Sequence, residues 1–271
     1  AYREAGLLER ARQAAIRATE LAQEIDNKPI GANSRSQRAM VEFMDGNYDT
    51  AMRLWTEANG IAESIYNFWG RSMAIGLSAS LRFERGDLGA AIQGWEESLR
   101  LAEAVGFLSP AAIYRGDLGW CYLTVGAGEQ ADQHFEATHT VIDARFPFWR
   151  PWILGHLSRA ATAHGTLDLA ATYLAQAEEA LPARTEFFPF QQAHVGLAAV
   201  ELKLAWHDYA GAAAEACARG DVQRGLMRPY VADFEYLEGE ALRLSGALEA
   251  AVRTLSRARA TASALGGRRI L

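Results

Sequence analysis

GNYDTA at residues 46–51 and GDLGAA at residues 86–91 are two copies of one short motif, and the recurrence of this motif decides the fold. Seven copies can be aligned along the chain, with alanine at the sixth position of each. Successive copies start 39 to 42 residues apart, and a nearly constant period of this size is typical of proteins built from stacked repeats. The copies start at residues 6, 46, 86, 126, 165, 207 and 246.

The residue types in the motif predict a turn between two helices. Glycine opens every copy except the one at His207, and glycine adopts the left-handed conformation that ends a helix without a Cβ clash. Asn47, Asp87 and Asp208 follow the opening residue in three copies, where each side chain is expected to cap the next helix. The alanine one turn later predicts a close crossing of the two helices.

We call the helix before each turn helix A and the helix after it helix B. Helix B carries a bulky residue four positions after the alanine, such as Trp55, Trp95 or Phe135, and a small residue three positions later. This spacing places them on one buried face. Helix A carries a small residue seven positions before the turn in five copies, while the copy at residue 207 has Val200 there. Each unit is therefore predicted to be an antiparallel helix pair that must stack on its neighbours.

The small residue in helix A, the G-[DN]-[YL]-x-x-A turn and the bulky-then-small pattern in helix B together resemble the tetratricopeptide repeat (TPR) family over essentially the whole chain. The period is near 40 rather than the usual 34, and the tryptophan early in helix A and the proline closing helix B are missing. Longer units of this kind resemble the C-terminal arrays of bacterial signal-transduction ATPases, transcriptional regulators and multidomain cyclases. The resemblance implies an all-α, right-handed α-solenoid of six to seven helix pairs, forming one TPR-like domain over residues 1–271.

Composition excludes several classes of partner. The chain has 271 residues, a net charge of −6 and a pI near 5.6, a balance that repels phosphate and disfavours nucleic acid. No apolar stretch approaches the length of about 20 residues that spans a bilayer, so no membrane partner is expected. Two isolated cysteines, Cys121 and Cys217, fit a reducing cytoplasm. The chain starts at an alanine and within a helical pattern, so we expect a fragment of a larger protein.

The sequence shows no convincing constellation for catalysis. GAGEQA at residues 126–131 matches a loose dinucleotide-binding pattern, but it coincides with a repeat turn and follows no predicted strand. The six histidines make no i, i+4 pair that would direct two imidazoles at one metal ion. We therefore predict a protein that is not an enzyme, with no catalytic residue, metal or cofactor.

Aromatic residues gather where helix B leads into the next helix A. Residues 145–152 read RFPFWRPW, and similar clusters lie near Phe68, Phe188 and Tyr230. One interpretation is that large side chains fill the space between long repeats. The other is a row of aromatic and arginine groups that stacks on a planar or sugar ligand or anchors a peptide. Gly76, Gly116 and Gly155 share one phase of three successive A helices, which indicates close approach by a neighbouring helix or by a ligand.

In the TPR fold the A helices line a concave face, and by this resemblance a groove would suit a partner with an apolar anchor and a basic end. The leading hypothesis is a non-catalytic scaffold or sensor module of a bacterial signalling or regulatory protein that binds a protein or peptide segment, including another domain of its parent. The alternatives are a small-molecule sensor with a pocket near residues 145–159, and a structural spacer or self-association module. The candidate groove residues are Met73, Trp120, Trp149, Arg150, Trp152, His156, Arg159, His194, Tyr230 and Asp233.

Overall fold

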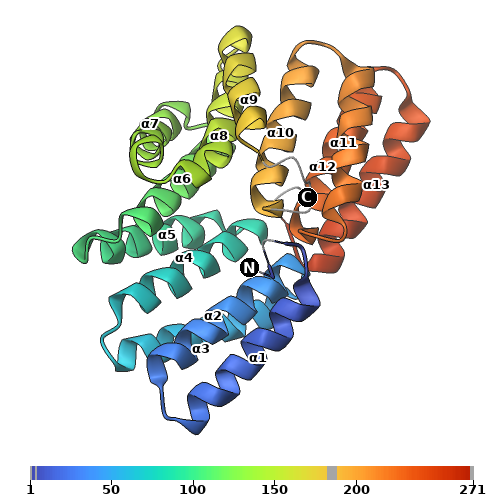
Figure 1. Ribbon diagram of the computed structural model, residues 1–271. Helices are drawn as coiled ribbons and strands as arrows, with labels where there is room; N and C mark the ends of the chain where they lie inside the picture. Colours follow the sequence, from blue (N-terminus) through green and yellow to red (C-terminus); the bar gives the residue numbers. More distant parts are fainter. Residues whose placement is uncertain (1, 4, 182–187, 269–271) are drawn as a thin grey trace.

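The computed structural model describes residues 2–3, 5–181 and 188–268, which form thirteen α-helices and two short 3-10 helices. The predicted all-α solenoid of helix pairs is confirmed (Figure 1). The helices, in chain order, are α1 (Leu8–Glu24), α2 (Lys28–Met44), α3 (Tyr48–Ser64), α4 (Phe68–Glu84), α5 (Leu88–Ala104), α6 (Leu108–Thr124), α7 (Gly128–Arg145), η1 (Pro147–Trp149), α8 (Arg150–Ala163), α9 (Leu167–Ala180), α10 (Pro189–Ala205), α11 (Tyr209–Gln223), η2 (Arg228–Tyr230), α12 (Val231–Leu244) and α13 (Leu248–Leu265).

Every predicted turn motif begins with a left-handed residue. The six glycines have φ between +69° and +84°, and His207 takes the same conformation with φ of 61°. Asp87 and Asp208 cap the following helices, since their carboxylates accept the backbone N–H of Ala90 and Gly211. The predicted cap at Asn47 is wrong, because its side-chain amide instead donates to the buried carboxylate of Glu42 at 2.9 Å.

The two helices of a unit pack as their small and bulky positions predict. Trp55, Trp95 and Phe135 are at most 1% exposed, and the motif alanines from Ala51 onward are buried. Gly119 lies under the Phe135 ring, where an added Cβ would come within 2.7 Å of the ring. The small residue of helix A therefore makes room for the large residue of helix B, which explains why the two recur together.

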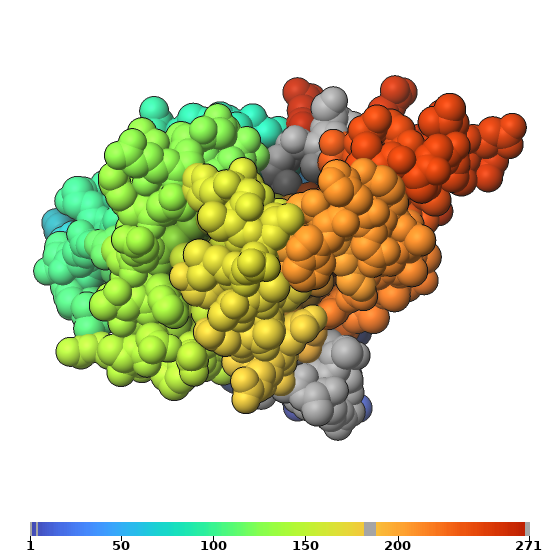
Figure 2. Space-filling model, turned by 90° about the horizontal axis from the view of Figure 1, so that it is seen from above, coloured from blue at the N-terminus to red at the C-terminus, as the bar shows by residue number. Residues whose placement is uncertain are grey.

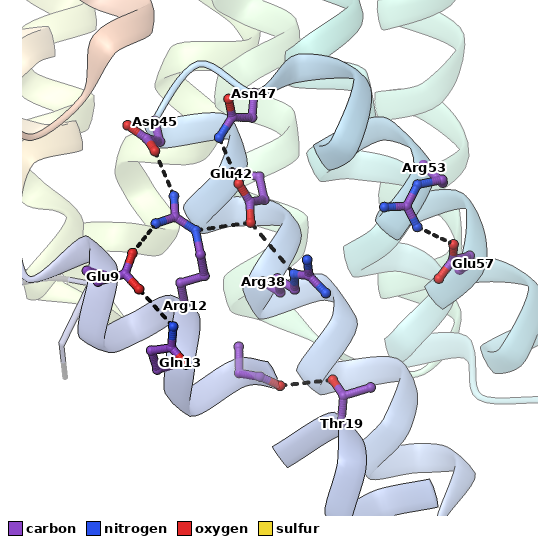
Figure 3. Close-up of polar contacts among 11 residues, drawn as sticks. Glu9, Arg12, Gln13, Thr19, Arg38, Glu42, Asp45, Asn47, Arg53 and Glu57 are labelled. Carbon is purple, nitrogen blue, oxygen red and sulfur yellow. Dashed lines mark hydrogen bonds and ion pairs between the residues drawn. The ribbon is translucent and has the colours of Figure 1, made fainter. Parts of the chain in front are cut away.

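A charged network fixes the first helix, α1, to the pair that follows it (Figure 3). The Arg12 guanidinium donates to Glu42 at 3.1 Å and to Asp45 at 2.6 Å, and Glu42 also receives the amide of Asn47. Burial opposes the charge on Arg12, but hydrogen bonds to Glu9, Asp45 and Glu42 outweigh it and raise the pKa of the guanidinium. Because Glu42 is buried, the ion pair satisfies a carboxylate that would otherwise be costly to enclose.

The stacking changes at α10. Each of the helices α4, α6 and α8 is a helix A that lies against the helix B before it. Helix α10 instead packs mainly on α8 and touches α9, the helix B before it, less. In the view from above, the yellow α9 and the orange α10–α11 pair lie side by side (Figure 2). The solenoid thereby curls inward, and the end of α13 returns to α4, where the Arg268 N–H donates to the Glu84 carbonyl at 3.0 Å.

Candidate functional site

Five rings from five successive A-side segments meet inside the superhelix, and we call them the inner ring cluster. Trp120 on α6 lies at its centre, 4.7 Å from Phe83, 5.5 Å from His156 and 4.8 Å from His194, measured between ring centroids. Tyr230 of η2 completes the set, and its hydroxyl is 2.8 Å from His194 Nε2. The cluster joins the first half of the solenoid, through α4 and α6, to the second half, through α8, α10 and η2.

The cluster members occupy different phases of the repeat, and the phase moves by one helical turn from each segment to the next. Their distances before the turn residues are 3, 6, 9, 13 and 16 positions. The ten candidate groove residues include the other four members of the cluster but not Phe83. The signal that identifies the cluster is a diagonal of aromatic residues and histidines across the repeats: Phe83, Trp120, His156, His194 and Tyr230.

His156, like His194, is a fully enclosed polar group of the cluster. It is 0% exposed and lies between the rings of Trp120, Phe135, Trp152 and His194. Neither ring nitrogen has a hydrogen-bond partner among the described residues. Burial, together with the positive charge of Arg159, holds the pKa of His156 well below its usual value, so the imidazole is neutral near pH 7.

Arg159 closes one side of the cluster. Its guanidinium makes a bidentate ion pair with Glu201, at 2.7 and 2.8 Å, and its Cζ lies 5.7 Å from the centroid of the Trp120 ring. Arg159 and Glu201 occupy equivalent positions of α8 and α10, each six residues before its turn. Their ion pair therefore also holds the two helices together. Arg150, in contrast, faces Asp143 of α7 at 2.8 Å, on a more exposed part of the surface.

The glycines at the shared A-helix phase are covered by neighbouring helices. A Cβ at Gly76 would lie 2.3 Å from the Tyr114 ring, and one at Gly116 would lie 2.2 Å from the Trp152 ring. Gly155 faces the α10 backbone, with an added Cβ 3.4 Å away. Close approach by a neighbouring helix, the first interpretation of these glycines, is what the structure shows.

The ten candidate residues divide into two groups. Met73, Trp149, Arg150 and Arg159 are partly exposed, and Met73 Sδ accepts the Tyr114 hydroxyl at 3.3 Å. The other six pack inside, so a ligand does not reach them in this closed arrangement, and binding by any of the ten stays a prediction. Residues 182–187, next to the predicted cluster around Phe188, lie outside the described residues. The buried six are Trp120, Trp152, His156, His194, Tyr230 and Asp233.

An open cleft lies at the seam where the end of α13 meets the first repeats. Its volume is about 770 Å³, and it is lined by the turns that begin at Gly46 and Gly86 and by residues 263–266 and 268. Asp49, Arg85 and Asp87 supply charge, and Arg85 is ion-paired with Asp49. None of the ten candidate groove residues lines this cleft, and neither does any residue of 145–159.

Exposed apolar side chains recur at the B-to-A turns, and we call this row the outer apolar edge. The α1–α2, α3–α4 and α5–α6 turns follow one another along one side of the molecule (Figure 1). Tyr66 is 84% exposed and Ile25 is 67% exposed, which is high for side chains of this size. The members of the outer apolar edge are Ile25, Ile30, Tyr66, Phe68, Val105, Leu108 and Phe148.

The described residues contain no group of three or more histidine, cysteine, aspartate or glutamate side chains placed to hold a metal ion. Across residues 2–3, 5–181 and 188–268, no helix is long and apolar enough to cross a membrane.

No protein-family model and no curated protein matches the chain. Several solved structures do. The apo form of RapI has a TM-score of 0.69 at 13% identity, over 94% of this chain and 92% of that one. The Rap conjugation gene regulator of plasmid pLS20, in complex with the Phr* peptide, has a TM-score of 0.70 at 15% identity, over 92% and 72% of the two chains.

A Rap protein complexed with Competence and Sporulation Factor has a TM-score of 0.69 at 13% identity, over 91% of this chain and 73% of that one. The Cut9 assembly of the APC/C is also similar, with a TM-score of 0.59 at 15% identity. These similarities confirm the resemblance that the repeat motif predicts: the chain has the fold of a tetratricopeptide-type helical-repeat array.

Proposed function

We propose that the chain is a non-catalytic module that binds a protein or peptide segment, in the cytoplasm, as part of a larger signalling or regulatory protein. The observation that carries the proposal is the outer apolar edge, where two large apolar side chains stand exposed at each of three successive turns. Side chains placed at a constant period match a partner that runs along the repeats.

The chemistry of the edge favours a helical or extended apolar partner. Tyr66 and Phe68 present aromatic rings two residues apart, and aromatic side chains contribute strongly at protein interfaces. Leu108 and Val105 of the next turn continue the apolar surface. One of the similar Rap structures is a complex with the Phr* peptide and another is a complex with Competence and Sporulation Factor, which supports this proposal.

The experiment compares partner capture by matched variants. Tyr66→Ser with Phe68→Ser removes the two aromatic rings of the edge, while Val125→Ser with Leu248→Ser removes two exposed apolar side chains at A-to-B turns. Quantitative mass spectrometry of proteins captured from the source cell is expected to show partners retained by the native chain and by the second variant. Those partners are expected to fall at least about tenfold with the first variant, equivalent to about 1.4 kcal/mol of binding.

Equal capture by all three chains would overturn the role of the outer apolar edge.

The small-molecule sensor remains the second candidate function, with a different site from the one first expected. The seam cleft of about 770 Å³ has the size of a small-molecule pocket, and native mass spectrometry of the chain from its source cell would show such a ligand as a fixed added mass.

A further inference from the structure

Two of the A-to-B turns are covered by another part of the chain, although all share one local conformation. An added Cβ at Gly46 would lie 2.3 Å from Leu265 Cδ2, and one at Gly86 would lie 3.4 Å from Arg268 Cβ. Both cover residues belong to the segment that ends α13. At the equivalent turns of later repeats an added Cβ would meet nothing within 4 Å, namely at Gly126, Gly165 and Gly246.

The covering segment completes the end of a helix. The last carbonyls of an α-helix have no partner within the helix, and that end carries partial negative charge. The Arg268 N–H donates to the carbonyl of Glu84, the last residue of α4, at 3.0 Å. A carbonyl at the end of α2 also receives a hydrogen bond from a distant residue, because the Arg228 guanidinium donates to the Asp45 carbonyl at 3.1 Å.

The covering segment places an apolar residue, two glycines and a basic residue on these turns. Leu265 is 8% exposed and belongs to the main core cluster. Gly267 is buried against the Glu84 carbonyl, where an added Cβ would make ordinary contact at 3.4 Å, and Gly266 takes the left-handed conformation with φ of 73°. Arg268 leads outward into the seam cleft, which Asp49 and Asp87 also line. Thus the positions read, in order, an apolar side chain, two small residues and a cation.

We propose that the Gly46 and Gly86 turns form a peptide-recognition site for an apolar–small–small–basic segment, which residues 265–268 occupy within the same chain. A partner segment of the same chemistry competes for this seat. The chain's own segment then acts as an internal inhibitor, because it must leave before the partner binds. This site is distinct from the outer apolar edge, which lies at the opposite, B-to-A turns.

The test uses a fluorescein-labelled peptide with the sequence of residues 258–268, ARATASALGGR, and the full chain in three forms. Leu265→Asp and the milder Leu265→Ala release the internal segment, while Leu248→Asp changes an apolar residue of the same helix that is 61% exposed. A tethered segment has an effective concentration near the millimolar range, so the free peptide competes poorly against it. We expect binding to the two Leu265 variants to be at least about tenfold tighter than to the native chain or Leu248→Asp.

A peptide in which the leucine is replaced by aspartate is the matched ligand control, and it is expected to bind none of the chains. Hydrogen exchange supplies the second readout, because the Arg268 amide and the residues around Gly46 and Gly86 should lose protection in the Leu265 variants. If Leu265→Asp does not fold, Leu265→Ala decides the outcome, with its fold checked by circular dichroism. Equal binding to native and variant chains, or no binding to a folded Leu265→Ala chain, would overturn the proposal.

Discussion

The first half of the molecule is regular and the second half is not. Helices α1 to α6 all have 17 residues, whereas α8, α9 and α12 have 14. In the regular half each helix packs on its neighbour in sequence. In the second half α10 passes over the short α9 and packs mainly on α8, which curls the solenoid until α13 meets the first repeats.

The difference teaches that the repeat motif sets the pairing of helices, while departures from the motif set the shape of the whole. Nothing in the seven turns distinguishes a straight array from a closed one. The closure depends on contacts between residues far apart in sequence, such as Trp120 with His194 and Arg228 with Asp45. Each prediction below separates a contact between the halves from a matched feature of a single repeat.

The largest effect is expected for Trp152→Ala. Trp152 of α8 is 0% exposed and its ring rests on Gly116 of α6, so it joins the two halves. Replacing a buried tryptophan by alanine lowers the free energy of unfolding by about 3–5 kcal/mol through lost burial and a residual cavity. Urea unfolding followed by circular dichroism measures this loss.

Trp206→Ala is the control for Trp152→Ala, because Trp206 is 49% exposed and its loss should change stability by at most about 0.5 kcal/mol. Hydrogen exchange then tests the comparison itself. In the Trp152→Ala chain, protection should fall more in α10 and α12 than in α2 and α4. An equal loss throughout would mean that the two halves unfold as one unit.

The second prediction concerns two glycines inside helices. Alanine usually stabilises a helix interior relative to glycine, by about 1 kcal/mol. At exposed Gly60 of α3 an added Cβ meets nothing within 4 Å, so Gly60→Ala should stabilise the chain by up to that amount. At Gly116 the same Cβ would lie 2.2 Å from the Trp152 ring, and Gly116→Ala should destabilise by about 1–3 kcal/mol.

Thermal unfolding of the two glycine variants side by side gives opposite signs of change if the contact between α6 and α8 is as tight as described. Stabilisation by Gly116→Ala would show that the Trp152 ring moves away at little cost. In that case the junction between the halves would be a loose contact.

The elements of the fold were predictable to a high degree, because the turn glycines, the motif alanines and residues such as Trp55 act within one repeat. The candidate site was predictable only in part. Trp120, His156, His194 and Tyr230 were identified, but as the lining of an open groove, since their burial depends on how far the solenoid curls. The seat of Leu265 gave no signal at all, because the Gly46 turn that receives it looks the same as the open turns.

The third prediction is the pH dependence of the inner ring cluster. The folded chain keeps the pKa of His156 well below its usual value, so below about pH 6.5 the unfolded chain takes up a proton that the folded chain does not. This linkage lowers the free energy of unfolding by up to about 1.4 kcal/mol for each pH unit of acidification. His156→Phe keeps a ring among the others and removes the titrating group.

Asp117 changes the pH dependence of stability in the opposite direction to His156. The effect of His156 is therefore measured as the difference between His156→Phe and the native chain, in which Asp117 is common to both. Burial raises the pKa of Asp117 to about 8, so the folded chain holds a proton between about pH 4 and pH 8 that the unfolded chain has lost. Burying Asp117 therefore lowers the free energy of unfolding less as the pH falls, so the chain gains stability from this group on acidification. Urea unfolding from pH 7 to pH 5 should show that His156→Phe gains stability relative to the native chain, whereas parallel curves would contradict a neutral, buried His156.

The smallest effect is expected from the helix caps, and here the two halves should behave alike. Asp87 caps α5 in the regular half and Asp208 caps α11 in the second half, each by accepting one backbone N–H. Replacing either by alanine should lower the free energy of unfolding by about 1 kcal/mol, because a cap acts within its own turn. Chemical unfolding of both single variants and of the double variant should give effects that agree and add within about 0.5 kcal/mol. A much larger loss for Asp208→Ala would mean that the turn at His207 also supports the closure, and that local and long-range contacts are not separable there.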